Sequence, residues 1–321
     1  MAEGVAPDTT TATSPLRVAI TGGAGFIGSH VVDHLLAAGH QVRVIDVRRP
    51  HRADVAHAPV DIDDVDGLVV ALDDIDVVFH LAGVSNVNDA YEHPLDTVAV
   101  NVSGTANVWE AARRTNVHRA VLASTVWVYA GADEDRDLDE EAPFNLPGAG
   151  HIYTSSKIAA EMIVHNYREL YGVPFTILRY GIPFGPRMRE VLLIPRFVRR
   201  ALDGEPLTIN GDGHQFRNYV YIADLAEAHL RVLADVAENE VFNLEGREPV
   251  SVCQLVDALQ ALFDGQLRVE HLPTRAGDYA GREVSAAKAF RLLGWQAHTS
   301  FSDGLARYVE WYRTHHEAEV G

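Results

Sequence analysis

Residues 17–30 read RVAITGGAGFIGSH, an apolar run followed by closely spaced glycines. The run 18–21 predicts a short buried strand, because it is apolar, partly β-branched and bounded by glycines. Gly22, Gly25 and Gly28 follow at three-residue spacing; without side chains they allow a tight strand-to-helix turn and let a pyrophosphate approach the backbone. The unpaired N–H groups of the next helix start would then face an anion. The pattern indicates a dinucleotide-binding site.

The flanks of this turn support the interpretation. An amphipathic helix is predicted up to Gly39, with an apolar face made by Ile27, Val31, Leu35 and Leu36. The next predicted strand, QVRVID, ends at Asp46, whose carboxylate can accept hydrogen bonds from the adenosine ribose and would repel a 2'-phosphate. NAD is therefore expected rather than NADP, although Arg48 and Arg49 are close enough to partner a phosphate. The alternative is a glycine loop in another kind of α/β protein.

Composition narrows the class of protein. The chain has 321 residues, 47% of them apolar, which suits one large domain or two closely packed ones. A net charge of -18 argues against nucleic acid or an anionic membrane as the main partner. Cys253 is the only cysteine, so an intrachain disulfide is excluded, and a reducing, cytoplasmic location is expected. No apolar run approaches the about 18 to 20 residues of a membrane span.

The predicted elements alternate between strand and helix through the first half of the chain. Strands are expected at 58–62, 76–81, 120–125 and 174–180, and helices at 65–72, 94–115 and 152–171. Such alternation predicts an α/β fold, a doubly wound parallel Rossmann sheet with ligands outside the carboxyl ends of its strands.

From about Gly181 the pattern changes to loops rich in proline and glycine with shorter elements. Helices are predicted at 192–202, 222–234, 252–263 and 300–315, with short strands near Leu207, Tyr219 and Val241. We expect a disordered tail at 1–15, an NAD-binding Rossmann domain at 16–180 that also receives a strand and a helix from the C-terminal half, and a smaller α/β substrate-binding domain at 181–321.

Tyr153 and Lys157 are the strongest candidates for chemistry. Four residues apart, they lie on one face of the predicted helix. A nearby ammonium favours the phenolate and lowers the pKa of a tyrosine toward neutrality, where it can exchange protons. Ser124 and Thr125 end a strand at the expected cofactor edge, where a hydroxyl can bind a substrate oxygen. A structural role remains the alternative for both pairs, and also for Asn101, which either bonds the backbone near the site or is an ordinary helix residue.

Several motifs together resemble one family. They are TGGAGFIG, HLAG, NVSGT, STVWVY, YTSSK, LRYGIPFGP, RNYVYIADLAEAH and RAGD, in that order from Leu16 to about Trp295. The chain resembles the extended short-chain dehydrogenase/reductases that act on nucleotide sugars and include UDP-galactose 4-epimerase. The resemblance implies a bound NAD, Thr125 with its neighbour Ser124 as the catalytic hydroxyl, Tyr153 as the acid/base, and Lys157 as the residue that binds the nicotinamide ribose and lowers the Tyr153 pKa.

The cofactor contacts expected from motif and position form one set. Asp61 and Ile62 are placed beside the adenine by position alone, and Ala82-Gly83 is a small-residue turn where a cofactor can pass closely. The full set is Gly22, Gly25, Phe26, Ile27, Gly28, Asp46, Asp61, Ile62, Leu81, Ala82, Gly83, Asn101, Tyr153, Lys157, Tyr180 and Ile182.

The residues after Thr125 favour one reaction. Related dehydratases carry an Asp-Glu pair directly after the threonine, and related decarboxylases a glutamate two residues after it; here these positions are Val126 and Trp127. Without an extra carboxylate, the remaining chemistry is removal and return of a hydride, as in a 4-epimerase that works through a 4-keto sugar. A one-way reductase or dehydrogenase of a nucleotide sugar is the alternative, and a non-catalytic NAD sensor is a different class.

The substrate half carries weaker signals. The resemblance implies that Arg217 and Arg275 bind the nucleotide diphosphate and that Asp278 follows toward the ribose. The related epimerases have an RYFNPxG strand end, whereas this chain has RYGIPFGP, so Gly181 and Ile182 offer no polar side chain at this point. Arg187 and Arg189 suit a hexuronate carboxylate. The expected substrate contacts are Ser85, Thr125, Trp127, Arg187, Arg217, Arg275 and Asp278.

Two further expectations concern metal and assembly. The 16 histidines form no compact ligand pattern, so no metal site is expected, and His80 is expected to pack under the sheet edge. The resemblance suggests a homodimer through the helices at 94–115 and 152–171. Neither the nucleotide base nor the sugar follows from the sequence, and substrates of the UDP-glucose/galactose and UDP-glucuronate/galacturonate types are both open.

Overall fold

The structure is a computed structural model that describes residues 14–132, 138–273 and 281–320. The chain divides into two compact units. The first unit comprises Met1–Tyr180, Ala226–Leu244 and Val284–Trp295; the second comprises Gly181–Leu225, Glu245–Glu283 and Gln296–Gly321.

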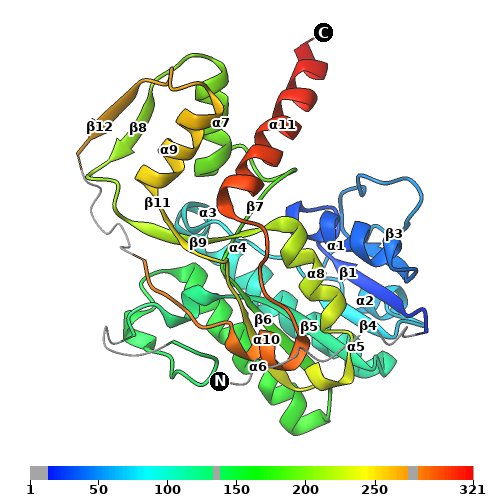
Figure 1. Cartoon of the computed structure of the whole chain (residues 1–321). Coiled ribbons are helices and arrows are strands. Elements are labelled where there is room, and N and C mark those ends of the chain that lie inside the picture. Colours follow the sequence, from blue (N-terminus) through cyan, green and yellow to red (C-terminus); the bar gives the residue numbers. More distant parts are fainter. Residues whose placement is uncertain (1–13, 133–137, 274–280, 321) are drawn as a thin grey trace, which may run out of the picture. The chain divides into compact units, whose positions relative to one another are not determined.

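A seven-stranded sheet forms the centre of the first unit (Figure 1), and all of its strand pairs are parallel. The spatial order is β10-β6-β5-β4-β1-β2-β3, so the strand order reverses beside β1, as in a doubly wound Rossmann sheet. The strands are β1 (Arg17–Thr21), β2 (Gln41–Ile45), β3 (Ala56–Ala58), β4 (Val77–His80), β5 (Arg119–Thr125), β6 (Phe175–Tyr180) and β10 (Glu240–Leu244). The expected fold class is confirmed.

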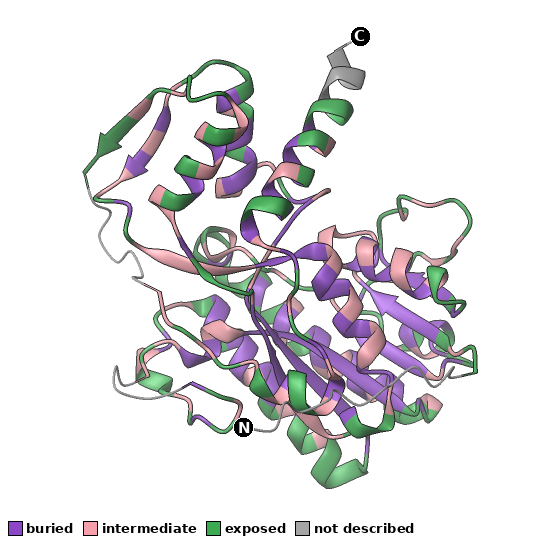
Figure 2. Ribbon diagram, in the orientation of Figure 1, coloured by how far each residue is buried: buried purple, intermediate pink, exposed green. Residues whose placement is uncertain are grey.

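The central strands are buried along their whole length because both faces of the sheet are covered. Every residue of β5 and β6 is buried, which Figure 2 shows as continuous purple in the middle of the sheet. One face packs against helices α2 (Val65–Ala71), α5 (Gly104–Thr115) and α6 (Ile152–Tyr171), with Trp109 among the largest fully buried side chains. The opposite face carries Phe79, whose ring meets that of His229 in α8 (Ile222–Arg231).

The glycine-rich turn leads from β1 into α1 (Phe26–Ala37). Beyond β4, the chain forms two short helices, α3 (Val87–Glu92) and α4 (Pro94–Val98), before α5. Further along the chain, after β10 and a passage through the second unit, α10 (Ala287–Leu293) belongs again to the first unit. The Lys288 ammonium in α10 pairs with the Glu240 carboxylate at the start of β10, at 2.7 Å.

Two predicted elements differ from the structure. The strand expected at 58–62 is instead Ala56–Ala58, which pairs with β2, because Pro59 has no N–H to continue a ladder. The single helix expected at 94–115 consists of α4, a π-helical turn at Ala99–Ser103 and α5. Such π-helical turns are frequent at functional sites, and this one contains Asn101.

The second unit contains two small sheets. One has the order β11-β9-β7, with β9 (Phe216–Tyr221) between β11 (Pro249–Ser251) and β7 (Ile182–Phe184); the other pairs β8 (Leu207–Asn210) with β12 (Val269–Leu272). Its helices are α7 (Leu193–Leu202), α9 (Val252–Leu262) and α11 (Phe301–Val320). Aromatic rings of Phe184, Tyr219, Tyr221 and Phe301 contact one another in its core.

Among the described helices, none has both the length and the apolar character that crossing a bilayer requires.

Candidate active site

The turn after β1 has no room for side chains. Gly22 has a φ of 72°, a left-handed conformation that favours glycine, and a Cβ there would lie 2.6 Å from the Ala82 backbone nitrogen. A Cβ at Gly28 would overlap the Gly22 carbonyl oxygen, so α1 starts directly against the turn. Phe26 and Ile27 form the first turn of α1, whose leading N–H groups have no helical partner. This arrangement fits the pyrophosphate of a dinucleotide.

Asp46 follows β2 and is buried beside the same turn. Its carboxylate accepts hydrogen bonds from the Ala24 N–H at 3.1 Å and from the Arg48 N–H at 2.9 Å. The Arg48 guanidinium lies 3.5 Å from it. The carboxylate therefore joins β2 to the glycine turn and places a negative charge where an adenosine ribose would bind. These residues fit NAD, and the arginine at this position is already paired with the acid.

The other residues expected along the cofactor lie on several loops. Ile62 is buried against Gly104 at the start of α5, whereas the Asp61 side chain is exposed and accepts from the Asp63 N–H. Leu81 donates its N–H to the Thr21 carbonyl. A Cβ at Gly83 would lie 3.0 Å from Asn101 Oδ1 and 3.4 Å from Lys157 Nζ, so the backbone of this turn passes close to the candidate catalytic lysine.

Thr125, Tyr153 and Lys157 come together in the first unit. Thr125 is the last residue of β5, and its hydroxyl lies near enough to the phenol of Tyr153 to act on the pKa of that group. The same Thr125 oxygen accepts the Trp127 N–H at 3.2 Å. Lys157 is one helical turn beyond Tyr153 in α6, as the four-residue spacing predicts, and its ammonium donates to the Ala123 carbonyl oxygen at 3.0 Å. All three side chains are buried.

The charge state of this group differs from the sequence expectation. Burial raises the pKa of Tyr153 to about 12, and the Thr125 hydroxyl opposes that rise. Burial also lowers the pKa of Lys157 to about 8, which the nearby Glu161 carboxylate opposes. A lowering of the Tyr153 pKa by Lys157 was expected, and the structure contradicts it, because desolvation dominates and the ammonium is bonded to a backbone carbonyl.

Ser124 takes part in a different network from Thr125. Its hydroxyl donates to Glu161, which lies two helical turns beyond Tyr153 in α6. Glu161 also forms a buried ion pair with Arg179 at 2.7 Å, and Arg179 donates to the Tyr129 hydroxyl at 2.6 Å. The hydroxyl of Ser124 thus belongs to a buried structural network and forms no hydrogen bond with Tyr153. Sequence reasoning missed this network, although Glu161 is four residues after Lys157 and so shares its helical face.

Asn101 holds the loop after β4 in place. Its side-chain oxygen accepts the Val84 N–H at 2.8 Å, and its amide donates to the Val84 carbonyl and to Ser156, both at 2.9 Å. Since Ser156 precedes Lys157 in α6, Asn101 connects that loop to the helix that carries the candidate lysine. Of the two interpretations that the sequence left open for Asn101, the geometry matches the bond to the backbone near the site.

Two buried histidines, His80 and His229, form hydrogen bonds in the first unit. His80 is hydrogen bonded on both ring nitrogens, to Thr21 at 2.7 Å and to Thr105 at 3.1 Å. Burial, together with the charge of Lys157, lowers the pKa of His80 to about 3, so the ring is neutral. Tyr180, another expected cofactor contact, pairs in register with Thr125, and its hydroxyl is 2.7 Å from the His229 Nε2. Its neighbour Ile182 belongs to the second unit.

The ring of His151 contacts the rings of both Trp127 and Tyr153. The ring centroid of His151 lies 5.3 Å from that of Trp127 and 6.2 Å from that of Tyr153. His151 Nδ1 accepts the Thr154 N–H at 3.3 Å and thereby caps α6. The neutral ring consequently carries its hydrogen on Nε2. Sequence analysis did not single out this histidine; a cap just before a helix was the available signal.

The expected substrate residues are divided between the units. Ser85 is exposed on the loop after β4. In the second unit, Arg187 has a left-handed φ of 67°, unusual for a residue other than glycine, and Arg217 donates to the carbonyl oxygen of Phe216 at 2.7 Å. Arg275 and Asp278 lie outside the described residues. Within the described part of the chain, no three His, Cys, Asp or Glu side chains gather as a metal site would require.

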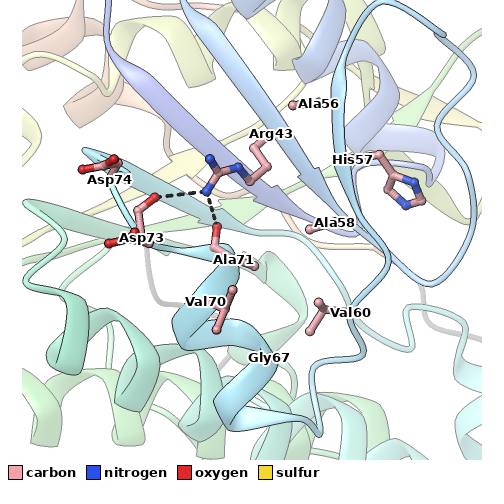
Figure 3. A pocket seen from close by; sticks show the side chains of 10 residues that line it. All are labelled: Arg43, Ala56, His57, Ala58, Val60, Gly67, Val70, Ala71, Asp73 and Asp74. Atoms are coloured by element: carbon pink, nitrogen blue, oxygen red, sulfur yellow. Dashed lines mark hydrogen bonds between the residues drawn. The ribbon is translucent and has the colours of Figure 1, made fainter.

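A pocket of about 460 Å³ lies elsewhere in the first unit, between edge strand β3 and helix α2. Figure 3 shows its lining, in which the Arg43 guanidinium donates to the carbonyl oxygens of Ala71 and Asp73. Its lining includes none of the predicted site residues. This pocket is therefore separate from the Thr125–Tyr153–Lys157 group.

Comparison with known proteins places these features in a family. Residues 18–244 match the model of the NAD dependent epimerase/dehydratase family. The chain is 30% identical over 312 residues to a UDP-glucuronate 4-epimerase of Thermodesulfobacterium geofontis, covering 91% of this chain and 94% of that one. It is 27% identical over 315 residues to a UDP-N-acetyl-alpha-D-glucosaminuronate decarboxylase of Bacillus cytotoxicus, covering 92% and 98%.

The fold also matches solved structures. UDP-glucuronic acid 4-epimerase from Bacillus cereus, solved in complex with UDP-glucuronic acid and NAD, aligns with a TM-score of 0.84 at 28% identity, over 93% of this chain and 99% of that chain. The family model spans the glycine turn, Asp46 and the Thr125–Tyr153–Lys157 group, which are the features that the geometry brings together. The chain therefore belongs to the NAD-dependent epimerase/dehydratase family.

Proposed function

We propose that this protein is an NAD-dependent nucleotide-sugar epimerase that inverts the sugar at C4. The observation that carries the proposal is the buried group of Thr125, Tyr153 and Lys157. The residues that follow the threonine, Val126 and Trp127, are not carboxylates. Dehydration and decarboxylation call for a further acid or base beside the threonine. Relatives named as 4-epimerases support this proposal, and the side chains after Thr125 argue against the decarboxylation named for another relative.

The roles of the residues follow from their positions. Bound NAD supplies a hydride acceptor that returns the same hydride, and the glycine turn, Asp46 and Lys157 are the residues proposed to hold it. The Tyr153 phenolate takes the proton from the sugar C4 hydroxyl and later gives it back. Thr125 orients that oxygen with its hydroxyl, which also favours the phenolate form of Tyr153. Lys157, fixed by the Ala123 carbonyl, places its ammonium close to the backbone turn at Gly83.

The substrate is proposed to be a UDP-sugar. Diphosphate binding is assigned to Arg217 and, on sequence grounds, to Arg275, with Asp278 toward the ribose. Both the UDP-glucose/galactose and the UDP-glucuronate/galacturonate type are retained, since relatives with each name occur. Arg187 and Arg189 are the proposed partners of a hexuronate carboxylate.

The test is an epimerisation assay with the purified protein and its bound cofactor. UDP-glucose, UDP-glucuronate and UDP-N-acetylglucosamine are incubated separately, and the products are resolved by chromatography. We expect interconversion of one epimer pair without added NAD and without a lasting change in nicotinamide absorbance. Net NADH formation would indicate a one-way dehydrogenase, and a 4-keto-6-deoxy product would indicate a dehydratase.

We also propose a homodimer working in the cytoplasm, where nucleotide sugars and NAD are available. Exposed apolar side chains gather on helices that contact one another: Tyr91, Leu95 and Val98 on α3 and α4, and Met162, Leu170 and Tyr171 on α6. Second copies of the same face would cover them. Light scattering should give twice the monomer mass of 35.2 kDa for the wild type, and Leu95→Glu with Met162→Glu should give the monomer. Val70→Glu, an exposed position on α2, is the matched control.

A further inference from the structure

Gly181 and Glu245 start the segments that follow two neighbouring strands. β6 ends at Tyr180 and β10 at Leu244, and these two residues are partners in the sheet register. Within the second unit, a Cβ on Gly181 would overlap the Glu245 Oε2 atom and would lie 2.9 Å from the Asn218 carbonyl oxygen. The carboxyl group of Glu245 therefore occupies the space that a side chain at position 181 would take.

The carboxyl group is buried without a full set of partners. Glu245 is 5% exposed. Its Oε2 atom and the Oδ1 atom of Asn218 are both buried, and neither forms a hydrogen bond with any residue that the structure describes. Leaving such an atom unpaired costs about 1 to 3 kcal/mol, and native proteins keep few of them. Two orphaned polar atoms, on segments that both lie against Gly181, indicate a ligand that brings hydrogen-bonding groups.

Burial also decides the form of this group. It raises the pKa of Glu245 to about 8, against the effect of the Gly246 N–H. At neutral pH the group is therefore mainly a carboxylic acid, which both donates and accepts a hydrogen bond. A neutral acid of this kind suits a hydroxyl group, because it adds no charge that would repel a diphosphate.

The segment that lies against the Glu245 carboxyl group, Gly181-Ile182, lacks a polar side chain that could bind a substrate. The epimerases that the chain resembles have an asparagine there. We propose that Glu245, with Asn218 beside it, is a specificity-determining residue that binds hydroxyl groups of the nucleotide-sugar substrate and supplies the polar group that Gly181-Ile182 does not provide. The inference rests on the proposed function and deepens it. The hydroxyls belong either to the sugar or to the nucleotide ribose.

The test compares two substitutions. Glu245→Leu keeps the volume but removes the polar group, and Glu245→Gln keeps both a donor and an acceptor. We expect Glu245→Leu to raise KM for the UDP-sugar roughly five- to tenfold with a small change in kcat, as for removal of one hydrogen bond. Glu245→Gln should recover most of the wild-type KM. Glu240→Gln, at the other end of β10, is the matched control and should leave KM unchanged.

Calorimetry on the protein with its bound cofactor distinguishes the two sources of hydroxyls. If Glu245 binds the sugar, Glu245→Leu weakens the binding of the UDP-sugar but not the binding of UDP. If it binds the ribose, the variant weakens the binding of both ligands equally. Either result supports the inference. If the dissociation constants of Glu245→Leu for both ligands stay within twofold of the wild-type constants, the inference is overturned and Glu245 has only a structural role. Thermal unfolding confirms that each variant is folded.

Gly181→Ala provides a second variant. Its methyl group would displace the Glu245 carboxyl and also press on the Asn218 carbonyl oxygen, so it should raise KM at least to a similar extent. The double variant with Glu245→Leu should raise KM by less than the product of the two single effects. Full additivity would contradict the inference. Failure of the proposed function is recognised separately, because the wild type would then convert no nucleotide sugar at all, while the calorimetric comparison would still report on Glu245.

Discussion

The Lys157 ammonium donates a hydrogen bond to the carbonyl oxygen of Ala123, 3.0 Å away, two residues before Thr125 in β5. The lysine is thus attached to the strand that carries the candidate catalytic hydroxyl, and the ammonium is buried at that point. The hydrogen bond to Ala123 fixes the position of the Lys157 ammonium in the site. Burial of the same ammonium removes it from water and so lowers the stability of the folded protein. This conflict is typical of functional sites, where stability is lower than the packing would allow.

Lys157→Met should abolish turnover and increase thermal stability at neutral pH. Burial lowers the pKa of Lys157 to about 8, below the ordinary 10.5. Below about pH 8 the Lys157 side chain is protonated in both the folded and the unfolded chain. The buried charge then lowers the stability of the folded chain by at most about 3 kcal/mol. As the pH rises from about 8 to 10.5 the folded chain loses this cost. Scanning calorimetry should therefore show a gain in unfolding temperature for the variant at pH 7 that shrinks toward pH 10, and a gain that stays constant over this range would contradict the assignment.

Tyr153→Phe should lower kcat by about a thousandfold or more while cofactor binding persists, as expected for loss of an acid/base group. Burial raises the pKa of Tyr153 to about 12, so the phenolate fraction in the free enzyme grows as the pH rises. kcat/KM should accordingly increase toward alkaline pH. Cofactor content is measured by absorbance after denaturation. A variant that keeps substantial turnover would remove Tyr153 from the mechanism.

Thr125→Val should lower kcat/KM and move its alkaline rise to higher pH. The Thr125 hydroxyl is the group that opposes the raised pKa of Tyr153, so its removal leaves the phenol still harder to ionise. Steady-state rates measured across the alkaline range for both proteins provide the comparison. Ser124→Ala is the paired variant: its hydroxyl bonds Glu161, so we expect a loss of stability with little movement of the pH profile. An equal shift for both variants would contradict separate roles.

Gly28→Ala should eliminate NAD binding. A Cβ at Gly28 would overlap the Gly22 carbonyl, and backbone atoms cannot yield as a flexible side chain can. Gly39→Asn is the control, since nothing lies within 4 Å of a Cβ there and asparagine tolerates its left-handed φ of 87°. Equilibrium dialysis with NAD measures the effect. Normal NAD affinity of a folded Gly28→Ala protein would count against the assigned turn.

Stability should decrease as the pH falls below about 6.5, in part because of His80. The ring is neutral in the folded chain, where burial lowers its pKa to about 3, whereas the unfolded chain binds a proton near pH 6.5. Between these values the unfolded state binds more protons, so acid favours unfolding. His80→Gln, which can still bond Thr21 and Thr105, should unfold at lower pH in an acid titration followed by circular dichroism. An unchanged midpoint would show that other groups dominate.

Much of the first unit follows from local pattern. The glycine spacing at 22–28 predicted the strand, the turn and the helix, because only glycine allows the backbone contacts seen there. The helix expected at 152–171 matches α6, since a 20-residue periodic segment leaves little ambiguity. The strand expected at 58–62 was wrong by several residues, because pairing with β2, a non-local event, decides which residues of that segment join the sheet.

The candidate site was predictable only where residues are neighbours in the chain. The shared position of Tyr153 and Lys157 on one helix face was predictable, because a helix brings residues four apart onto the same face. The Glu161–Arg179 pair, the Asn101–Ser156 bond and the cap at His151 were not, because they join segments far apart in sequence or compete with ordinary surface roles. The direction of the Tyr153 pKa shift was also inaccessible, since it depends on burial, which no spacing reports.

Residue types and their order specified the doubly wound sheet, the glycine turn, the acid that ends β2 and the membership of one enzyme family, because each of these depends on local backbone geometry or on short spacings. Folding in three dimensions determined which hydroxyl meets Tyr153, which carbonyl holds Lys157, and that the Glu245 carboxyl fills the space above Gly181. These facts depend on desolvation and on contacts between distant segments, which arise only when the chain has packed.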